Sequence, residues 1–230
     1  MKQAKQPDLG TQLCFAVLDA DIDRTKHLLA QGADVNAVGD RRYTVVAHRI
    51  PLWLAVRSAG MIGSEHWKEF INDLGQVLPR VLDRDDAAKR ARYFELIQLL
   101  IESKANLEGV SFGTTPLWPA INSADLELTQ LLLTHGANPN ARCLSVLSRL
   151  AKVERVKGPL GLMGYCGTLL HGAAQKSSPE IVKALLAAGA DPAVTNDEGQ
   201  TALQMAVERG SEQIVTILKA AQSSSTFTQK

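Results

Sequence analysis

This sequence contains few side chains that could catalyse a reaction or bind a metal at the spacing that such a site requires. No two histidines form an H-E-x-x-H or similar ligand pair. The five histidines are His27, His48, His66, His135 and His171. The three cysteines contain no C-x-x-C pair: Cys14, Cys143 and Cys166. We therefore predict neither a zinc site nor a disulfide framework, and the odd cysteine count fits a reducing compartment.

Two further stretches are candidates for ligand chemistry. The acidic run DRDD at 83–86 offers carboxylates to a cation, but acids also favour the start of a helix. The glycine-rich GPLGLMG at 158–164 is followed by YCGTLLH rather than by the helix of a nucleotide-binding unit. No phosphate-loop motif of the G-x-x-x-x-G-K-[ST] type occurs. The sequence therefore predicts no cofactor, no metal, no catalytic residue and no enzyme activity.

The composition narrows the class of protein. Of 230 residues, 25 are Lys or Arg and 24 are Asp or Glu, so the formal net charge is only +1. This balance argues against a nucleic-acid or anionic-membrane partner. The start MKQAKQPDLG lacks the apolar region of a secretory signal, and no run of about 18 apolar residues is present. We expect a soluble, cytoplasmic protein.

One apolar phrase that ends in a turn recurs along the chain. It reads LLAQGADVN at 28–36, LLLTHGANPN at 131–140 and LLAAGADP at 185–192, with an altered copy, LLIESKANL, at 99–107. In three copies a leucine stands 20 residues before the alanine of the turn: Leu13 and Ala33, Leu117 and Ala137, Leu170 and Ala190. Leu203 follows Leu170 by 33 residues. A fixed unit of about this length indicates a stacked repeat array.

The unit that begins at Thr168 shows how each copy folds. Thr168 is expected to open a short helix, and Pro179 the second helix of the pair, because proline is favoured at the first helical position. Gly189 is expected to end that helix in the left-handed conformation. A single helix pair cannot bury its apolar face, so neighbouring pairs must stack.

These motifs resemble those of ankyrin repeats. TPLW at 115–118 and TLLH at 168–171 are similar to the family's T-P-L-H, and GADVNA at 32–37 and GANPNA at 136–141 to its finger turn. The resemblance implies an all-α solenoid of stacked helix-turn-helix units with short β-hairpin-like fingers. It divides a single array, 1–222, into five repeats, and residues 223–230 are expected to form a disordered tail. The repeats are approximately 8–44, 45–109, 110–141, 142–195 and 196–220.

Two insertions depart from the family pattern. The insert 61–92 lies between the two helices of the second repeat, and we expect it to pack on the array, with a long helix following in 83–103. The extended finger 142–165 belongs to the fourth repeat. Its five cations outnumber Glu154, so that 142–157 carries +4, and we expect it to contact a partner. The cations are Arg142, Arg149, Lys152, Arg155 and Lys157.

The resemblance also implies where a partner binds, since the family generally binds proteins through fingers and inner helices. The variable positions beside the first helices correspond to Arg49, Arg57, Phe112, Asn122, Tyr165, Gln175, Lys176, Glu208 and Arg209. To these we add the fingers' own Arg41, Arg42, Tyr43, Arg149, Lys152 and Arg155.

The resemblance assigns roles to three further residues. His171 takes the T-P-L-H position and is expected to be structural, and Cys14, at the same position, to be buried and inert. Asn36 resembles a finger asparagine that is hydroxylated in eukaryotic members of the family.

Three functions follow as hypotheses. The first is a non-catalytic scaffold that binds a partner protein through the concave finger and inner-helix face. The second is a stand-alone inhibitor or immunity protein that neutralises a cognate enzyme or toxin with an acidic surface. The third, against which the net charge argues, is nucleic-acid binding through the basic fingers.

Overall fold

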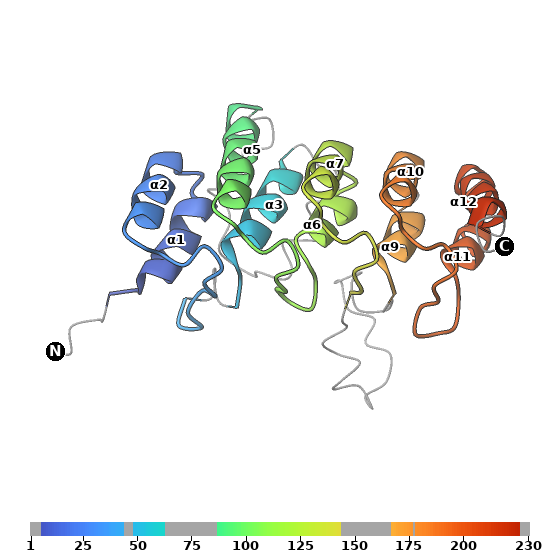
Figure 1. Ribbon diagram of the computed structural model, residues 1–230, viewed down its shortest axis with the longest axis horizontal. Coiled ribbons are helices and arrows are strands. Elements are labelled where there is room, and N and C mark those ends of the chain that lie inside the picture. Colours follow the sequence, from blue (N-terminus) through green and yellow to red (C-terminus); the bar gives the residue numbers. More distant parts are fainter. Residues whose placement is uncertain (1–5, 44–47, 63–86, 144–166, 177, 226–230) are drawn as a thin grey trace. The chain divides into compact units, whose positions relative to one another are not determined.

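The computed structural model describes residues 6–43, 48–62, 87–143, 167–176 and 178–225, and Figure 1 shows their helices. In these residues the regular structure is helical apart from isolated β-bridges, as the all-α expectation requires. The chain divides into two compact units, Met1–Phe112 and Gly113–Lys230. The helices of each unit form antiparallel pairs, so the protein is an all-α solenoid of stacked helix-turn-helix repeats.

The described residues of the first unit form two helix pairs. Its helices are α1 (Leu9–Leu18), α2 (Ile22–Ala30), α3 (Pro51–Met61) and α5 (Ala87–Glu102). Helix α1 packs against α2 and α3, and α3 packs against α5. The residues buried between these helices are mostly apolar. Tyr93 of α5 adds a hydrogen bond from its hydroxyl to the Leu18 carbonyl oxygen of α1 at 2.6 Å. Helix α5 confirms the long helix expected in 83–103, whereas most of the insert 61–92 lies outside the described residues.

The second unit contains three helix pairs. They are α6 (Leu117–Asn122) with α7 (Leu126–Thr134), α9 (Leu169–Gln175) with α10 (Pro179–Ala187), and α11 (Ala202–Glu208) with α12 (Glu212–Ser225). The first helices of the pairs pack in one row and the second helices in another. Burial of Leu128, Leu170 and Leu185 between the rows provides the hydrophobic stabilisation that no single pair has.

Local sequence sets the helix ends. Asp21 and Asp125 cap α2 and α7, since the carboxylate oxygens accept from the Arg24 and Leu128 N–H groups at 2.9 and 3.0 Å. Pro179 occupies the first turn of α10, and Gly189 ends that helix with φ at +92°. Both of these last positions confirm the sequence prediction.

Backbone hydrogen bonds or β-bridges join the two ends of three of the fingers. In the first finger (residues 37–50), the Gly39 N–H donates to the Arg49 carbonyl oxygen and the His48 N–H to that of Gly39, both at 3.0 Å. In the second unit, antiparallel bridges pair Arg142 with Thr168 and Thr195 with Thr201. The chain therefore turns back on itself before each new repeat.

The C-terminal boundary differs slightly from the one expected. Helix α12 continues to Ser225, past residue 223 at which we placed the start of the tail. The helix thus continues beyond residue 220, at which we placed the end of the last repeat. The boundaries of the five repeats and the assignment of residues 1–222 to a single array remain predictions.

Candidate functional site

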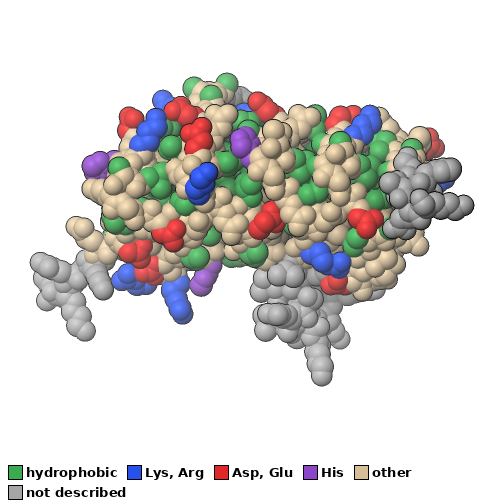
Figure 2. All heavy atoms as spheres, in the orientation of Figure 1, with side chains coloured by type: hydrophobic (Ala, Val, Ile, Leu, Met, Phe, Trp, Pro, Cys, Tyr) green, Lys and Arg blue, Asp and Glu red, His purple; other side chains and the backbone are tan. Residues whose placement is uncertain are grey.

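Six residues from two fingers and one helix of the first unit form two arginine–aromatic groups, an outer and an inner one, which we together call the arginine–aromatic cluster. They are Arg42, Tyr43, Arg49, Trp53, Arg57 and Phe112. Five of the six had been expected at a binding face, and Trp53 is the addition. Figure 2 shows basic and histidine side chains projecting from the molecule's edge in this region, where Arg41, Arg42 and His48 are exposed.

The first finger positions the outer part of the cluster. Asp40 accepts from the Arg42 backbone N–H at 2.9 Å and from its Nε at 2.8 Å. The Arg42 guanidinium carbon then lies 5.8 Å from the Tyr43 ring centroid, and Tyr43 meets Phe15 of α1 edge to face at 5.5 Å. These contacts hold one arginine and one tyrosine beside α1.

Electrostatics reinforce the Asp40–Arg42 pair. The hydrogen bonds from Arg42 lower the pKa of Asp40, so this carboxylate stays ionised and keeps its guanidinium partner. Because the pair is exposed, its contribution to the free energy of unfolding is small. Its effect is to fix the direction in which Arg42 points.

The inner part of the cluster alternates cations and rings. The Arg49 guanidinium lies 4.7 Å from the Phe112 ring centroid, Phe112 lies 5.8 Å from Trp53, and Arg57 lies 5.3 Å from Trp53. Arg49, Arg57 and Trp53 are buried, whereas 52% of Phe112 is exposed. Phe112 is therefore the part of this series that a partner can reach.

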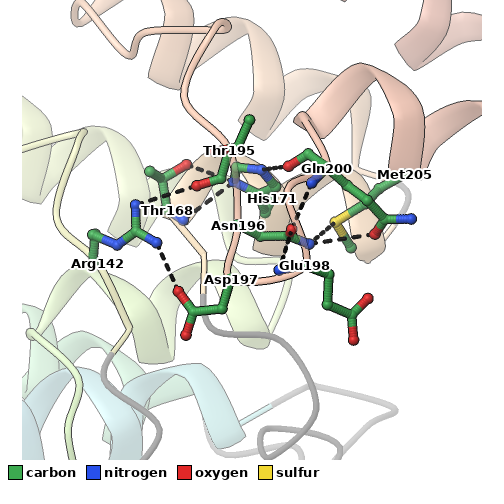
Figure 3. Close-up of polar contacts among 9 residues, drawn as sticks. All are labelled: Arg142, Thr168, His171, Thr195, Asn196, Asp197, Glu198, Gln200 and Met205. Carbon is green, nitrogen blue, oxygen red and sulfur yellow. Dashed lines mark hydrogen bonds and ion pairs between the residues drawn. The ribbon is translucent and has the colours of Figure 1, made fainter.

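A second polar cluster joins the last two fingers of the second unit, and Figure 3 shows it. Arg142 donates to the Thr195 carbonyl oxygen at 3.2 Å and to Asp197 at 3.0 Å. Asn196 accepts from the backbone N–H groups of Glu198 and Gln200 at 3.0 and 2.8 Å, which shapes the turn. The cluster organises the finger and engages Arg142, one of the cations counted toward a basic surface.

His171 is the centre of this cluster. The Thr168 N–H, which can only donate, lies 3.2 Å from Nδ1, so Nδ1 is the acceptor and Nε2 carries the proton. Nε2 donates to the Gln200 carbonyl oxygen at 2.9 Å. Burial, aided by the charge of Arg142, lowers the pKa of His171. The structure confirms that this neutral imidazole is structural.

Cys14 makes the equivalent contact in the first unit. Its thiol donates to the Arg49 carbonyl oxygen at 3.5 Å, just as His171 reaches the carbonyl that precedes the next repeat's first helix. Cys14 is fully buried, and burial raises its pKa to about 12. The prediction that Cys14 is buried and inert is confirmed.

The remaining predicted site residues fall into three groups. Arg41, Glu208 and Arg209 are exposed, and Gln175 and Lys176 are half-buried. Asn122, like Arg49 and Arg57, is buried and offers a partner little side-chain surface, because these residues face neighbouring helices or rings. Four lie outside the described residues: Arg149, Lys152, Arg155 and Tyr165.

Sequence reasoning named Asn36 only as a candidate for hydroxylation and missed that the finger asparagines link consecutive repeats. Asn140 donates to the Gly189 carbonyl oxygen at 2.9 Å and accepts from the Asp191 N–H at 2.8 Å, and Asn36 makes the corresponding pair with Lys104 and Asn106. The signal was present in the sequence, since both asparagines stand three residues after the alanine of the turn.

The described part of the chain gives two further results. None of its helices combines the length and apolar character needed to cross a membrane. It also brings together no group of three or more histidine, cysteine or acidic side chains suited to a metal ion.

Comparison with known proteins identifies the repeats. Residues 112–144 match the model of the ankyrin repeat, and residues 166–228 match a model of three ankyrin repeats. With the paired helices and finger hairpins of both units, these matches show that the chain is an ankyrin-repeat protein. Proteins of this class are generally non-catalytic modules that bind other proteins.

Three relatives illustrate the range of proteins that the chain resembles. It is 26% identical over 217 residues, 93% of the chain, to the putative ankyrin repeat protein YahD of Escherichia coli, and covers 97% of that protein. It is 35% identical over 125 residues, 54% of the chain, to a probable E3 ubiquitin-protein ligase of rice, XBOS34. It is 28% identical over 129 residues, again 54% of the chain, to human NF-kappa-B inhibitor alpha. The chain spans 21% and 38% of these last two proteins.

Proposed function

We propose that this protein acts without catalysis of its own, as a scaffold that binds one partner protein through its fingers and inner helices. The observation that carries the proposal is that two adjoining fingers of the first unit expose Arg41, Arg42 and Phe112 and leave Tyr43 half-buried. Arginine and aromatic side chains on a rigid support are typical of protein interfaces.

The supports of these side chains favour binding with little loss of entropy. The finger hairpin is closed by backbone hydrogen bonds, and the Asp40–Arg42 pair and the Tyr43–Phe15 contact orient its tip. A preorganised surface loses fewer rotamers when it binds. Arg149, Lys152, Arg155 and Tyr165 of the extended finger remain proposed contacts, as do Gln175, Lys176, Glu208 and Arg209.

Affinity capture from the source cell tests this proposal. The bait is the full chain, compared with Arg41→Glu and with a matched charge reversal on exposed α10, Lys183→Glu. We expect one stoichiometric protein on the intact bait and on Lys183→Glu, and a several-fold loss on Arg41→Glu. Circular dichroism confirms that the variants fold. Equal recovery of the partner on all three baits would show that it binds a surface other than the first finger.

The inhibitor function is the second candidate, and the similarity to NF-kappa-B inhibitor alpha favours it. A blocker needs the same rigid face but occludes an active or binding site on its partner. If the captured partner is an enzyme or toxin, its activity is titrated with the purified chain. Complete inhibition at one equivalent supports the inhibitor, and unchanged activity in a stable complex supports the scaffold.

A further inference from the structure

The first unit exposes an unusual share of large apolar side chains at its fingers. Among the described residues such exposed side chains are Leu9, Val38, Val110, Phe112 and Val207. Three of the five lie on the first finger and on the second finger (residues 104–112): Val38 at 58% exposure, Val110 at 52% and Phe112 at 52%. Single exposed apolar residues are ordinary, but several on adjoining loops indicate an interaction site.

The two fingers are tied together, so these side chains lie on adjoining loops. The Asn106 N–H donates to Asn36 Oδ1 at 2.7 Å, and the Ile50 N–H donates to Ser111 Oγ at 3.1 Å. Both loops leave the helices on the same side of the unit (Figure 1).

Phe112 is held in place against its own backbone preference. Its φ is +52°, in the left-handed region that a bulky residue rarely adopts. One part of its ring contacts Arg49 and Trp53, while about half of the residue faces solvent. A strained aromatic side chain on a fixed support is suited to be an interface anchor.

The accessible charge of the first finger is positive. Residues 38–57 contain four arginines and one aspartate, and because Arg49 and Arg57 are buried, the accessible arginines outnumber Asp40 by one. Arg41 and Arg42 are the exposed members, and 52% of the Arg42 side chain is accessible. A partner segment that lies here must therefore be acidic if the charges are to be complementary.

We propose that Val38, Arg41, Arg42, Val110 and Phe112 form a docking surface for an extended acidic segment of a partner protein that carries an aromatic or branched apolar side chain. The proposal rests on the protein-binding function above and specifies the chemistry of the partner. Acidic side chains of the segment pair with Arg41 and Arg42, and its apolar side chain packs on Phe112 and the two valines.

A protein segment fits this surface better than a nucleic acid. Single-stranded nucleic acids bind through a row of flat stacking rings and a long basic groove. Here two of the three exposed apolar side chains are valines, which bury apolar area but cannot stack on a base. Only two of the four arginines of residues 38–57 are exposed.

The test is an unbiased selection followed by binding measurements. A random peptide library displayed on phage is selected against the full chain, and the preferred peptides are synthesised and titrated by fluorescence anisotropy. We expect Asp and Glu to be enriched around an aromatic or branched apolar position. Arg41→Glu should weaken binding roughly threefold to tenfold, and added salt should weaken it further.

The anchor is tested with a matched pair of variants. Phe112→Asn removes the ring, and asparagine tolerates the left-handed backbone, so the finger keeps its conformation. Val207→Asn makes the same change at an equally exposed residue of α11, with 56% exposure. We expect Phe112→Asn to weaken binding about tenfold or more and Val207→Asn to change it less than twofold.

Three results would overturn the inference. Peptides without acidic enrichment, or binding that survives Phe112→Asn and Arg41→Glu, would place the recognised surface elsewhere and leave the proposed function standing. A single-stranded oligonucleotide that binds the intact chain and is lost with Phe112→Asn would assign the surface to nucleic acid. If no peptide is selected, the inference fails, and the lysate capture described above decides the proposed function separately.

Discussion

Asn140 and Asp191 lie 51 residues apart in the sequence, yet the Asp191 backbone N–H donates to Asn140 Oδ1 at 2.8 Å. The same amide donates to the Gly189 carbonyl oxygen at 2.9 Å. A carboxamide is suited to this position because it supplies one donor and one acceptor together. Asn36 joins the two repeats of the first unit in the same way, through Lys104 and Asn106.

Asn140→Asp should therefore destabilise the second unit although it is nearly isosteric. The acceptor is kept, but the donor is lost and a carboxylate faces the Gly189 carbonyl oxygen. We expect a loss of about 1–2 kcal/mol in the free energy of unfolding, measured by urea denaturation. Gln130→Ala, at an exposed position in the middle of α7, is the control and should change it by less than about 0.5 kcal/mol. Equal stability of Asn140→Asp and the intact chain would show that the link contributes nothing.

His171 should make stability depend on pH. Its pKa is lowered in the folded protein, so below about pH 6.5 the unfolded chain takes up a proton that the folded chain excludes. The stabilisation is thus present above that pH and is lost as the pH falls towards the folded pKa. The slope due to this one group is at most about 1.4 kcal/mol per pH unit.

The measurement compares urea unfolding of the intact chain and His171→Gln at pH 7.5 and pH 5. We expect the variant to be less stable at pH 7.5 by about 1–2 kcal/mol and the difference to shrink at pH 5. Gln204→Ala disturbs the corresponding cap of α11, where Gln204 accepts from the Thr201 N–H at 2.7 Å, without removing a titratable group. Its effect should be the same at both pH values. A pH-independent His171→Gln difference would contradict the neutral, buried imidazole.

Gly172 and Trp118 should be coupled. A Cβ atom on Gly172 would overlap the Trp118 ring of the preceding repeat, and both residues are buried. We expect Gly172→Ala to lower the free energy of unfolding by about 1–3 kcal/mol. Trp118→His restores the residue of the T-P-L-H motif and frees that space, so the double variant should be more stable than the sum of the single changes predicts.

A glycine with a different role provides the control for this cycle. Gly189 has φ at +92° and open space around its Cα, so Gly189→Ala strains the backbone without a steric clash. Its cost of about 1–2 kcal/mol should simply add to that of Trp118→His. Additivity in the Gly172 cycle would mean that the ring does not occupy the space as described.

Ala124→Gly should stabilise the protein. Ala20 and Ala124 occupy equivalent turns between paired helices with φ of 56° and 55°, and Gly210 takes the equivalent turn of the last repeat with φ at 68°. Removing the Cβ relieves the strain, although glycine loses more entropy on folding. We expect a net gain of about 0.5–1 kcal/mol in thermal or urea unfolding. Ala184→Gly, inside α10, should instead cost about 1 kcal/mol.

The elements of this fold could be predicted because they depend on near neighbours in the sequence. The i, i+4 spacing of apolar residues, the proline at 179 and the glycine at 189 act over about one helical turn, and each was found where the repeat places it. The positions of His171 and Cys14 followed from the register of the repeat, which also explains why they reach equivalent backbone carbonyls, those of Gln200 and Arg49.

The surface of the candidate site could not be predicted in the same way. Arg41, Arg42, Arg49 and Arg57 look alike in the sequence, but the structure exposes the first two and buries the others beside Phe112 and Trp53. Arg142 adds to a basic cluster by count, yet Asp197, 55 residues later, engages it. The exposure of Phe112 likewise depends on contacts with Arg49, 63 positions earlier.

The sequence by itself thus determined that this chain is a stack of helix pairs with finger turns, and which residues open and end the helices of the unit that begins at Thr168. The reason is that hydrophobic periodicity and backbone preferences are local and are repeated in every unit. Only the tertiary structure decided which cations and rings are presented to a partner, and that finger asparagines join consecutive repeats. Burial and pairing are set by residues from other repeats, whose identity at each position no local pattern contains.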